Sequence, residues 1–508
     1  MPAHTIADAH RQIAAEHGSR PAISLEGEVL LDHAGLADKA ARIASGLIAR
    51  GLAPGDRVGL VLGLSVEFYP LLLGIWTAGL TAVPIAPMIP PPDLASILRH
   101  AGAKLAVVEP PLAAPLGQTL AGEGPELLTP EQGASELASH PPCTTPREHP
   151  EGEAGTAWLF HTSGTTGRPK GVELSHQNLA ALVAGYADEV DQPGPEDCIL
   201  HLTPLSHGSG MAGLPHLLGG TNQVLPGARG LPNLPGVVEL IERWPRTALV
   251  LPPVVVDLLA RQVAELGPER VASIRAVLYG SSPMFPQVAA RAMDVFGPKL
   301  VQLYGLGEAP MSVILGREDH QELLAAGHSG PLPVGRARSG IELRVIDDEG
   351  RDCAPERVGQ VLLRGASITR GYLDAPEATA KVLREGWLHT GDLGWLDAQG
   401  RLYVVGRARD TVHTAAGPVY PQTLELHLLD HPAVAEAAII GRPSEAGHEE
   451  PIAFVGLDPQ APSVDEAALA AHCSTLPEHA QPRRFTIVDK LPRNGSGKIL
   501  KRVLRERA

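Results

Sequence analysis

Short apolar runs alternate with segments of helical length in the first part of the chain. Residues 57–64, RVGLVLGL, are rich in Val and Leu and suit a buried strand. A segment of helical length follows at 67–78, and 81–85, TAVPI, has the composition of a second strand. A strand, a helix and a further strand in this order are typical of a parallel sheet covered by helices. The pattern therefore predicts an α/β fold.

The same alternation recurs along the chain. Further apolar runs of strand length, with segments of helical length near them, lie at 105–108, 247–251 and 276–278. Residues 112–153 are instead rich in Pro, Gly and acidic side chains, so we expect them to include exposed loop. From about residue 335 the pattern changes, because 341–346 and 358–363 alternate and are punctuated like antiparallel β structure.

The length of 508 residues exceeds the size at which a single hydrophobic core stops growing, so at least two domains are expected. A fresh set of elements begins after Gly406–Arg407. We predict a large N-terminal domain, residues 1–408, made of helix-covered sheets and a β-rich subdomain. Residues 409–508 are expected to form a small, mobile α+β C-terminal domain.

Composition narrows the possible functions. The formal net charge of −15 fits poorly to a nucleic-acid binder or a polybasic membrane anchor, since both need clustered positive charge. The four cysteines form no CxxC pair, which argues against a disulfide framework or a zinc knuckle. The most apolar stretch, 68–85, is interrupted by Gly, Thr and Pro and is expected to be a buried helix and strand rather than a membrane span. The N-terminus lacks a basic stretch followed by an apolar core, so the expected location is cytoplasmic.

One loop stands out chemically. Residues 161–172 read HTSGTTGRPKGV and follow a strand-like run at 157–160. Glycines allow close backbone approach to an anion, and backbone N–H groups, hydroxyls and Lys170 can together neutralise phosphate oxygens. The sequence is not a Walker A loop, because Gly167 is followed by Arg-Pro-Lys. The predicted phosphate-binding residues are Thr162, Ser163, Gly164, Thr165, Thr166, Gly167 and Lys170.

The segment TSGTTGRPKG closely resembles the signature of the AMP-binding superfamily, which contains acyl-CoA synthetases, peptide-synthetase adenylation domains and luciferases. Other segments resemble further motifs of that family in the same order: PLSHGSG at 204–210, VLYGSSP at 277–283, QLYGLGE at 302–308, GWLHTGD at 386–392, GRARD at 406–410 and LPRNGSGKI at 491–499. The resemblance implies that the protein uses ATP to convert a carboxylic acid to an acyl-adenylate and then passes the acyl group to a thiol.

The resemblance also implies roles for individual residues. Lys498 corresponds to the adenylation lysine, and Glu308 to the ligand of Mg²⁺. Asp392 would accept hydrogen bonds from the ribose hydroxyls, and Arg407 would contact ribose or phosphate. The residues expected around the adenine ring are Ser281, Ser282, Pro283, Gln302, Tyr304 and Gly305, with Tyr304 stacking on the ring and Gln302 bonding its exocyclic amine.

Two positions depart from the family pattern. Gly307 stands where the family usually has a Thr that contacts the α-phosphate, and His413 stands where many relatives have Lys. By the same resemblance, Arg409 is the pivot of a hinge and Gly417 lines the thiol tunnel. The departures leave open a second class of function, an adenylate-binding protein that has lost catalysis.

The acyl pocket is expected to be uncharged. Its candidate residues, mostly small or apolar, are His207, Val250, Gly280, Ser281, Gly305 and Met311. His207 stands about where amino-acid-activating relatives carry an Asp, and a buried ammonium without a counter-charge is costly. An aromatic, alicyclic or medium-length acyl carboxylate is therefore expected rather than an α-amino acid. We favour CoA as the acceptor because the chain stands alone, and the phosphopantetheine arm of a carrier protein remains the alternative.

Overall fold

The computed structural model describes residues 5–162, 170–231, 233–328, 330–444, 447–459, 461–493 and 499–507. The chain forms two compact units, residues 1–342 with 363–388 and residues 343–362 with 389–508. It passes between them within three strands, β16 (Ile341–Ile346), β17 (Gly359–Gly365) and β20 (Trp387–Leu396). These strands belong to a five-stranded sheet that also contains β19 (Leu383–Arg384) and β21 (Leu402–Arg407).

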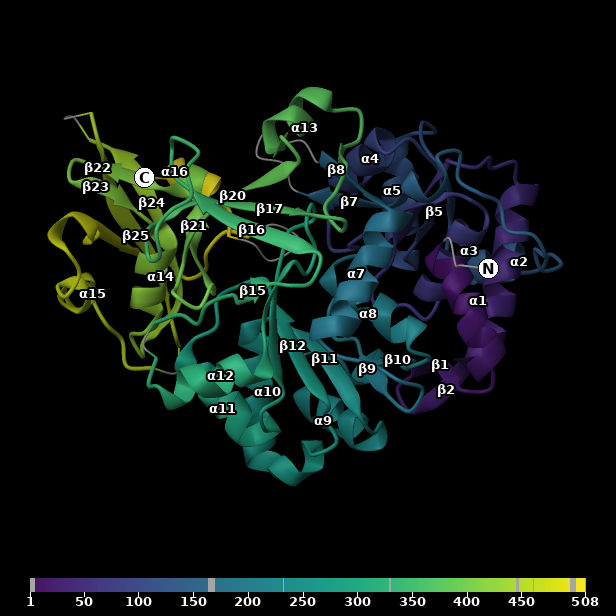
Figure 1. Ribbon diagram of the computed structural model, residues 1–508, viewed down its shortest axis with the longest axis horizontal. Helices are drawn as coiled ribbons and strands as arrows, with labels where there is room; N and C mark the ends of the chain where they lie inside the picture. Colours follow the sequence, from purple (N-terminus) through teal and green to yellow (C-terminus); the bar gives the residue numbers. More distant parts are fainter. Residues whose placement is uncertain are drawn as a thin grey trace. The chain divides into compact units, whose positions relative to one another are not determined.

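The first unit contains a nine-stranded sheet in the order β15-β14-β13-β12-β11-β9-β10-β1-β2. The bounds of its strands are Pro21–Leu25 (β1), Glu28–Asp32 (β2), Cys198–Leu200 (β9), Asn222–Leu225 (β10), Thr247–Leu251 (β11), Ala276–Gly280 (β12), Leu300–Tyr304 (β13), Val313–Leu315 (β14) and Arg336–Ala337 (β15). Parallel pairing joins β1, β10, β9, β11, β12 and β13, whereas β2, β14 and β15 pair antiparallel at the two edges. Figure 1 shows β11 and β12 side by side, with α10 (Pro253–Leu266) and α11 (Pro286–Phe296) near them.

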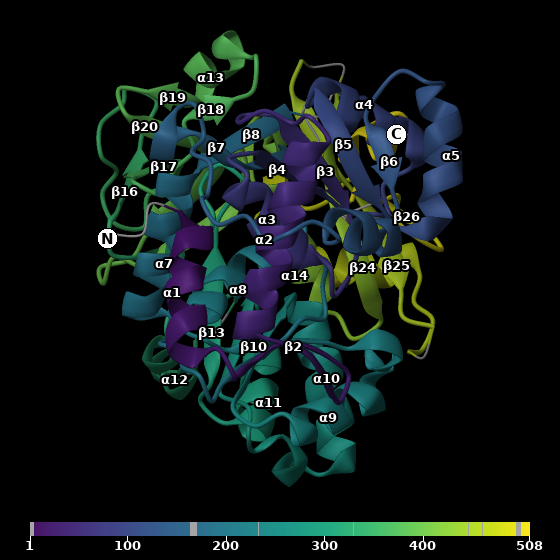
Figure 2. The ribbon, with the colours of Figure 1, turned by 90° about the vertical axis from the view of Figure 1, so that its right-hand side faces the viewer.

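A seven-stranded sheet of the same unit has the order β18-β8-β7-β4-β3-β5-β6. Its strands are Arg57–Val61 (β3), Thr81–Ile85 (β4), Ala103–Val108 (β5), Glu126–Leu128 (β6), Thr156–Thr162 (β7), Lys170–Ser175 (β8) and Gly371–Tyr372 (β18). Helices α2 (His33–Ala49) and α3 (Phe68–Thr77) pack together over this sheet (Figure 2). All ten residues of α3 are buried, which is why this helix is apolar on every side.

The first unit contains further α-helices, most of which lie against the two sheets or against helices that do. They are α1 (Ile6–His17), α4 (Pro91–His100), α5 (Pro110–Leu120), α6 (Pro130–Gln132), α7 (His176–Glu189), α8 (Gly208–Leu218), α9 (Leu234–Arg243), α12 (Arg317–Ala325) and α13 (Pro376–Val382). Ser175 begins α7 with a capping box, accepting from the Asn178 backbone while the Asn178 side chain accepts from the Ser175 backbone. This cap turns the chain from the strand after the phosphate loop directly into a helix.

The second unit contains the small α+β part of the chain. Strands β24 (Val434–Pro443) and β25 (Glu449–Leu457) pair antiparallel, and β26 (Arg484–Ile487) adds in parallel to β25. A hairpin of β22 (Val412–Thr414) and β23 (Gly417–Val419) precedes α14 (Pro421–Leu429), and α15 (Glu466–Cys473) and α16 (Lys501–Arg505) complete the unit. Side chains of α14, α15 and the three-stranded sheet share one apolar core.

The predicted fold class is confirmed, with helix-covered sheets, a β-rich subdomain and a small α+β domain. The runs predicted as strands at 81–85 and 247–251 are β4 and β11 with those bounds. Residues 112–153 are more ordered than their composition indicates, since α5 extends to Leu120 and β6 and two short helices follow. Turns, bends and irregular backbone occupy 121–125, 129 and 138–151, so the expected exposed loop is confined mainly to the last of these stretches. The expected domain boundary at 408/409 stays a prediction.

No helix in the described ranges is both long and apolar enough to cross a membrane.

A buried charge cluster holds the start of β12. Arg275 directly precedes this strand, and its guanidinium lies 2.7 Å from a carboxylate oxygen of Asp191 and 2.7 Å from one of Asp197. The Asp197 side chain is 2% exposed. Arg246 and Arg317 add weaker or more exposed partners to the same two carboxylates.

We predict that Arg275→Met lowers the free energy of unfolding by about 3 kcal/mol, because it leaves two buried carboxylates without their shared partner. Urea titration followed by circular dichroism measures the change. Arg261→Met is the control, since Arg261 is 58% exposed and pairs with Asp257 at the surface, where an ion pair contributes at most about 1 kcal/mol. Equal shifts for the two variants would contradict the prediction.

Candidate active site

The carboxyl ends of β12 and β13 bring two of the predicted motifs together. The strands pair in parallel with Tyr279 opposite Gln302 and Gly280 opposite Leu303. The turn 281–283 leaves the end of β12, and the segment 305–308 leaves the end of β13. In open α/β sheets, ligands bind outside the carboxyl ends of the strands. The expected adenine-contacting residues therefore occupy two adjacent strand ends of one sheet.

The backbone at this edge is tightly packed and locally strained. A Cβ atom at Gly280 would lie 2.3 Å from the carbonyl oxygen of Leu303, so only glycine fits. Ser281 and Met311 adopt φ values of +69° and +47°, which residues other than glycine rarely adopt. Strained non-glycine residues of this kind gather at functional sites. Val250, the pocket candidate on β11, is half-buried on the neighbouring strand.

Gln302 and Tyr304 lie two residues apart on β13 and so share one face of the sheet. Gln302 is 2% exposed, and the hydroxyl of Tyr279 lies 3.1 Å from its Oε1. Tyr304 is half-buried, and Gly305 after it is exposed. The amide is thus fixed by a buried neighbour, while the chain becomes accessible just beyond the strand.

Glu308 is held by a residue that sequence reasoning missed. The hydroxyl of Tyr372 on β18 donates to Glu308 Oε1 at 2.7 Å, and the backbone N–H of Thr369 donates to the Glu308 carbonyl at 2.8 Å. The Lys170 ammonium lies 4.9 Å from the centre of the Tyr372 ring, in cation–π range. Tyr372 therefore connects the predicted metal ligand to the last residue of the phosphate loop.

The donor set around Glu308 fits Mg²⁺ bound together with a nucleotide. Mg²⁺ is usually held by one or two carboxylates plus substrate phosphates and water rather than by an all-protein cage. In the parts of the chain that the structure describes, no group of three or more His, Cys, Asp or Glu side chains could hold a metal by itself. Glu308 can serve as the protein carboxylate of such a shared site.

The phosphate loop connects the two strands of a hairpin. Thr162 at the end of β7 is the register partner of Lys170 at the start of β8, and His161 is opposite Gly171. The predicted residues Ser163, Gly164, Thr165, Thr166 and Gly167 lie outside the described residues.

His207 is positioned at the N-terminus of α8. Its Nδ1 lies 2.9 Å from the Ser206 hydroxyl, and its ring meets the edge of Phe160 at 5.2 Å between centroids. Burial lowers the pKa of His207, because the imidazolium would lose its hydration. At neutral pH the side chain is therefore an uncharged polar group beside an aromatic ring.

In the second unit, the residue predicted to hold the ribose and the one predicted to contact ribose or phosphate are cross-strand partners. Asp392 on β20 is opposite Arg407 on β21, and the Arg407 Nε lies 2.7 Å from Asp392 Oδ1. Arg407 also donates to the Thr390 carbonyl at 3.1 Å, while the Thr390 hydroxyl accepts from the Asp392 backbone N–H at 3.0 Å. The Asp392 side chain is 6% exposed. The carboxylate is thus paired with a guanidinium, oriented and nearly enclosed.

The predicted hinge and tunnel residues lie in short connections. Arg409 is exposed in a 3₁₀ turn, Ala408–Asp410, and its Nε is 3.9 Å from Asp410 Oδ2. Gly417 begins β23 with φ +134°, a conformation that favours glycine. Arg493 and Ile499 pair as an isolated β-bridge, and the predicted catalytic Lys498 between them lies outside the described residues.

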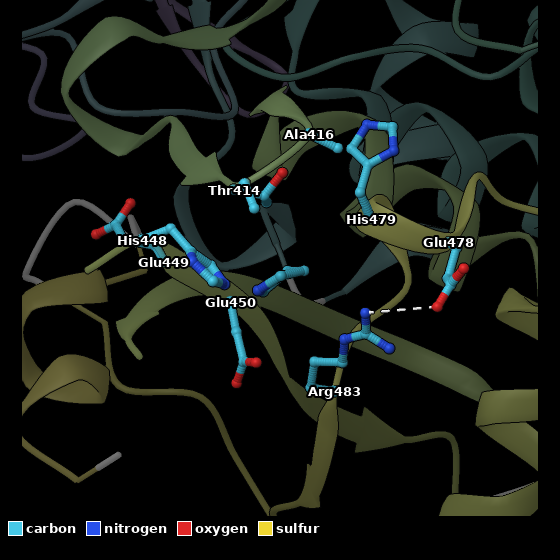
Figure 3. Close-up of a pocket in the computed structure, with 10 residues that line it drawn as sticks. Thr414, Ala416, His448, Glu449, Glu450, Glu478, His479 and Arg483 are labelled. Carbon is cyan, nitrogen blue, oxygen red and sulfur yellow. Dashed lines mark ion pairs between the residues drawn. The ribbon is translucent and has the colours of Figure 1, made fainter. Parts of the chain in front are cut away.

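A cavity of about 330 Å³ lies beside the β22–β23 hairpin (Figure 3). The turn residues Ala415 and Ala416 line it, together with three carboxylates and one guanidinium, those of Glu449, Glu450, Glu478 and Arg483. Arg483 lies 3.9 Å from Glu478, and the Glu449 carboxylate accepts from the His413 backbone N–H at 2.9 Å. His413 itself is exposed, so its departure from the family pattern alters the surface of the hairpin rather than its core.

Comparison with known proteins covers nearly the whole chain. The family described as AMP-binding enzyme matches residues 10–373, and the one described as AMP-binding enzyme C-terminal domain matches residues 423–498.

Individual relatives are similar to this chain over almost its full length. The fatty acid–[acyl-carrier-protein] ligase ScoC of Streptomyces coeruleorubidus is 31% identical, over 97% of this chain and 94% of that protein. Feruloyl-CoA synthase of an Amycolatopsis species is 31% identical, over 95% of this chain and 94% of that protein. The ATP-bound structure of MatB from Rhodopseudomonas palustris superposes with a TM-score of 0.86 at 28% identity, over 99% of this chain and 98% of that one.

We predict that His207 is mostly uncharged at pH 6.5 and above, since burial lowers its pKa below the ordinary value of about 6.5. Proton titration of the imidazole by NMR measures this, with His207→Gln assigning the resonance. A midpoint at or above about 6.5 would contradict the prediction and would make the pocket cationic in mild acid.

Proposed function

The chain belongs to the AMP-binding enzyme family and is an adenylate-forming acid ligase, and from that premise we propose that it activates an aromatic, alicyclic or medium-length acyl carboxylic acid and transfers the acyl group to CoA. Relatives that are 31% identical to this chain include both a CoA ligase and a carrier-protein ligase. Because these relatives differ in acid and in acceptor, both choices depend on the residues of this chain.

The observation that carries the proposal is the paired edge of β12 and β13. The turn 281–283 and the segment 302–308 leave adjacent parallel strands, with the tight contact at Gly280 between them. A flat ring needs close backbone approach on one side and a polar edge contact on the other. We assign adenine to this edge, with Ser281, Ser282, Pro283, Gln302, Tyr304 and Gly305 as its contacts.

The first reaction step is attack of the substrate carboxylate on the α-phosphorus of ATP, with departure of pyrophosphate. A carboxylate oxygen is a poor leaving group, and its conversion to an AMP ester divides one difficult reaction into two easier ones. Positioning and charge stabilisation carry such a phosphoryl-type transfer. Residues 162–167 and Lys170 hold the departing phosphates, and Lys498 bridges the carboxylate and the α-phosphate.

Two further groups hold the nucleotide. Mg²⁺, when bound at Glu308, supplies charge neutralisation for the phosphates. Asp392 accepts hydrogen bonds from the ribose hydroxyls, and Arg407 pairs with that carboxylate and orients it.

The second step is attack of a thiolate on the acyl-adenylate carbonyl, which releases AMP. It requires Lys498 to withdraw and the thiol to enter, a rearrangement of the kind that lids perform. We assign the pivot to Arg409 and the entry of the thiol to the segment at Gly417, with residues 409–508 as the moving part.

The acyl group is expected to carry no second charge. His207 is neutral and packs on Phe160, and Val250, Gly280 and Met311 offer neither a cation nor an anion. A buried ammonium or second carboxylate would have no partner among these residues, which disfavours α-amino acids and short diacids.

The alternative acceptor is a carrier protein, which the similarity to the carrier-protein ligase ScoC supports. CoA and a carrier protein present the same phosphopantetheine thiol, so the second step is chemically identical for both.

The test is acid-dependent pyrophosphate release with MgATP over a panel of carboxylic acids, with and without CoA or a holo-carrier protein. We expect release with uncharged aromatic or medium-chain acids and an acyl-CoA product. Adenylate formation with acylation of the carrier alone would replace CoA as the acceptor. ATP binding without release for any acid would contradict the catalytic proposal and favour a degenerate adenylate-binding protein.

We predict that Asp392→Asn raises the KM for ATP by about 10- to 100-fold, because a neutral amide replaces a charge-assisted acceptor of the ribose hydroxyls. Asp397→Asn is the matched control. Asp397 pairs with Arg401 at 2.6 Å between the same two strands, with a similarly buried carboxylate. A KM that rises equally in both variants would indicate a general effect on the sheet and would remove Asp392 from the nucleotide site.

A further inference from the structure

A buried hydrogen-bonded chain leads from α12 to the amide of Gln302. His320 Nδ1 lies 2.6 Å from the carbonyl oxygen of Gly316, and His320 Nε2 lies 2.7 Å from the Tyr279 hydroxyl. The same hydroxyl lies 3.1 Å from the side-chain amide of Gln302. Tyr279, His320 and Gln302 are each at most 2% exposed, so water does not compete for these bonds.

Counting protons fixes the direction of every bond in this chain. A carbonyl oxygen can only accept, so His320 Nδ1 carries the ring proton. Burial lowers the pKa of His320 to about 4, so the ring is neutral and its Nε2 is an acceptor. Burial also holds the pKa of Tyr279 above its usual range, so the phenol keeps one proton. That single proton must be donated to His320 Nε2.

Tyr279 can then only accept from Gln302. The oxygen and nitrogen of a side-chain amide have nearly the same shape and are distinguished by their hydrogen bonds rather than by their positions. With an Oε1 facing Tyr279, two acceptor oxygens would share no proton. With the amide turned by 180°, its Nε2–H donates to Tyr279, and its Oε1 becomes the end that faces away from the relay.

We propose that Tyr279 and His320 are positioning residues that present the Gln302 carbonyl oxygen as an acceptor and thereby select a 6-amino purine over a 6-oxo purine. The inference rests on the proposed function, which assigns Gln302 to the base edge of the nucleotide. An exocyclic amine donates to this oxygen, whereas a 6-oxo group would bring a second acceptor against it. A free amide could rotate to suit either base, so the selectivity comes from the relay.

The test is calorimetric binding of ATP and of inosine triphosphate, without any carboxylic acid, to the wild-type chain and to Tyr279→Phe. We expect the wild type to prefer ATP, and Tyr279→Phe to reduce the ratio of the two affinities about three- to tenfold, as expected for one lost neutral hydrogen bond. The reduction should come mainly from tighter binding of inosine triphosphate, because the freed amide can turn its N–H toward the 6-oxo group.

Matched variants separate positioning from stability. Tyr186→Phe removes another buried hydroxyl that bonds a buried histidine, Tyr186 Oη to His216 Nε2 at 2.9 Å, and should leave the ratio unchanged. His320→Gln can still donate to Gly316 and accept from Tyr279, so it should keep the preference. His320→Met cannot do both and should lose it.

Each outcome decides a different claim. A wild-type chain that binds neither nucleotide would overturn the nucleotide site and the inference with it. A wild-type preference for ATP that persists in Tyr279→Phe and His320→Met would overturn the relay alone. Equal affinities in the wild type would show that Gln302 does not read the base.

Discussion

The parallel pairing of β12 with β13 is the constraint on which the candidate site depends. Register places Tyr279 opposite Gln302 and lets both strands end at the same edge. A shift by one residue would move every side chain of a strand to the opposite face of the sheet. Apolar residues buried on both faces of these strands make such a shift costly, and Arg275 holds the start of β12 against two buried carboxylates. The geometry of the proposed adenine site thus follows from packing at the other end of the strand.

Charge is distributed in keeping with the proposed chemistry. His207 and His320 are kept neutral by burial, one beside the proposed acyl group and the other behind the proposed base. Carboxylates with oriented partners occur where phosphate, metal or ribose is expected, at Glu308 with Tyr372 and at Asp392 with Arg407. An uncharged pocket for the acyl group and paired charges for the nucleotide are what an acid-activating enzyme of this kind requires.

The sequence allowed much of this to be predicted, and what it did not allow has a physical cause. The phosphate loop, the segment from Gln302 to Glu308 and the segment ending at Asp392 are contiguous, so their chemistry is visible in the chain. The roles of Tyr372 and His320 are not visible, since each depends on contact with a residue far away in the sequence, Glu308 or Tyr279. The helices and short strand within 112–153 were also hidden, because Pro at a helix start is as compatible with order as with a loop.

Acyl-adenylate formation is tested most directly by following the oxygen of the substrate carboxylate. The substrate is a carboxylic acid that the enzyme accepts, labelled with ¹⁸O at both carboxylate oxygens. Attack on the α-phosphorus leaves one labelled oxygen as the bridge between carbon and phosphorus. Thiolysis at the carbon then releases this oxygen as part of AMP. We expect AMP carrying one ¹⁸O atom by mass spectrometry, with no label in pyrophosphate. Label in orthophosphate, with ADP as the other product, would mean activation as an acyl phosphate and would contradict acyl-adenylate formation.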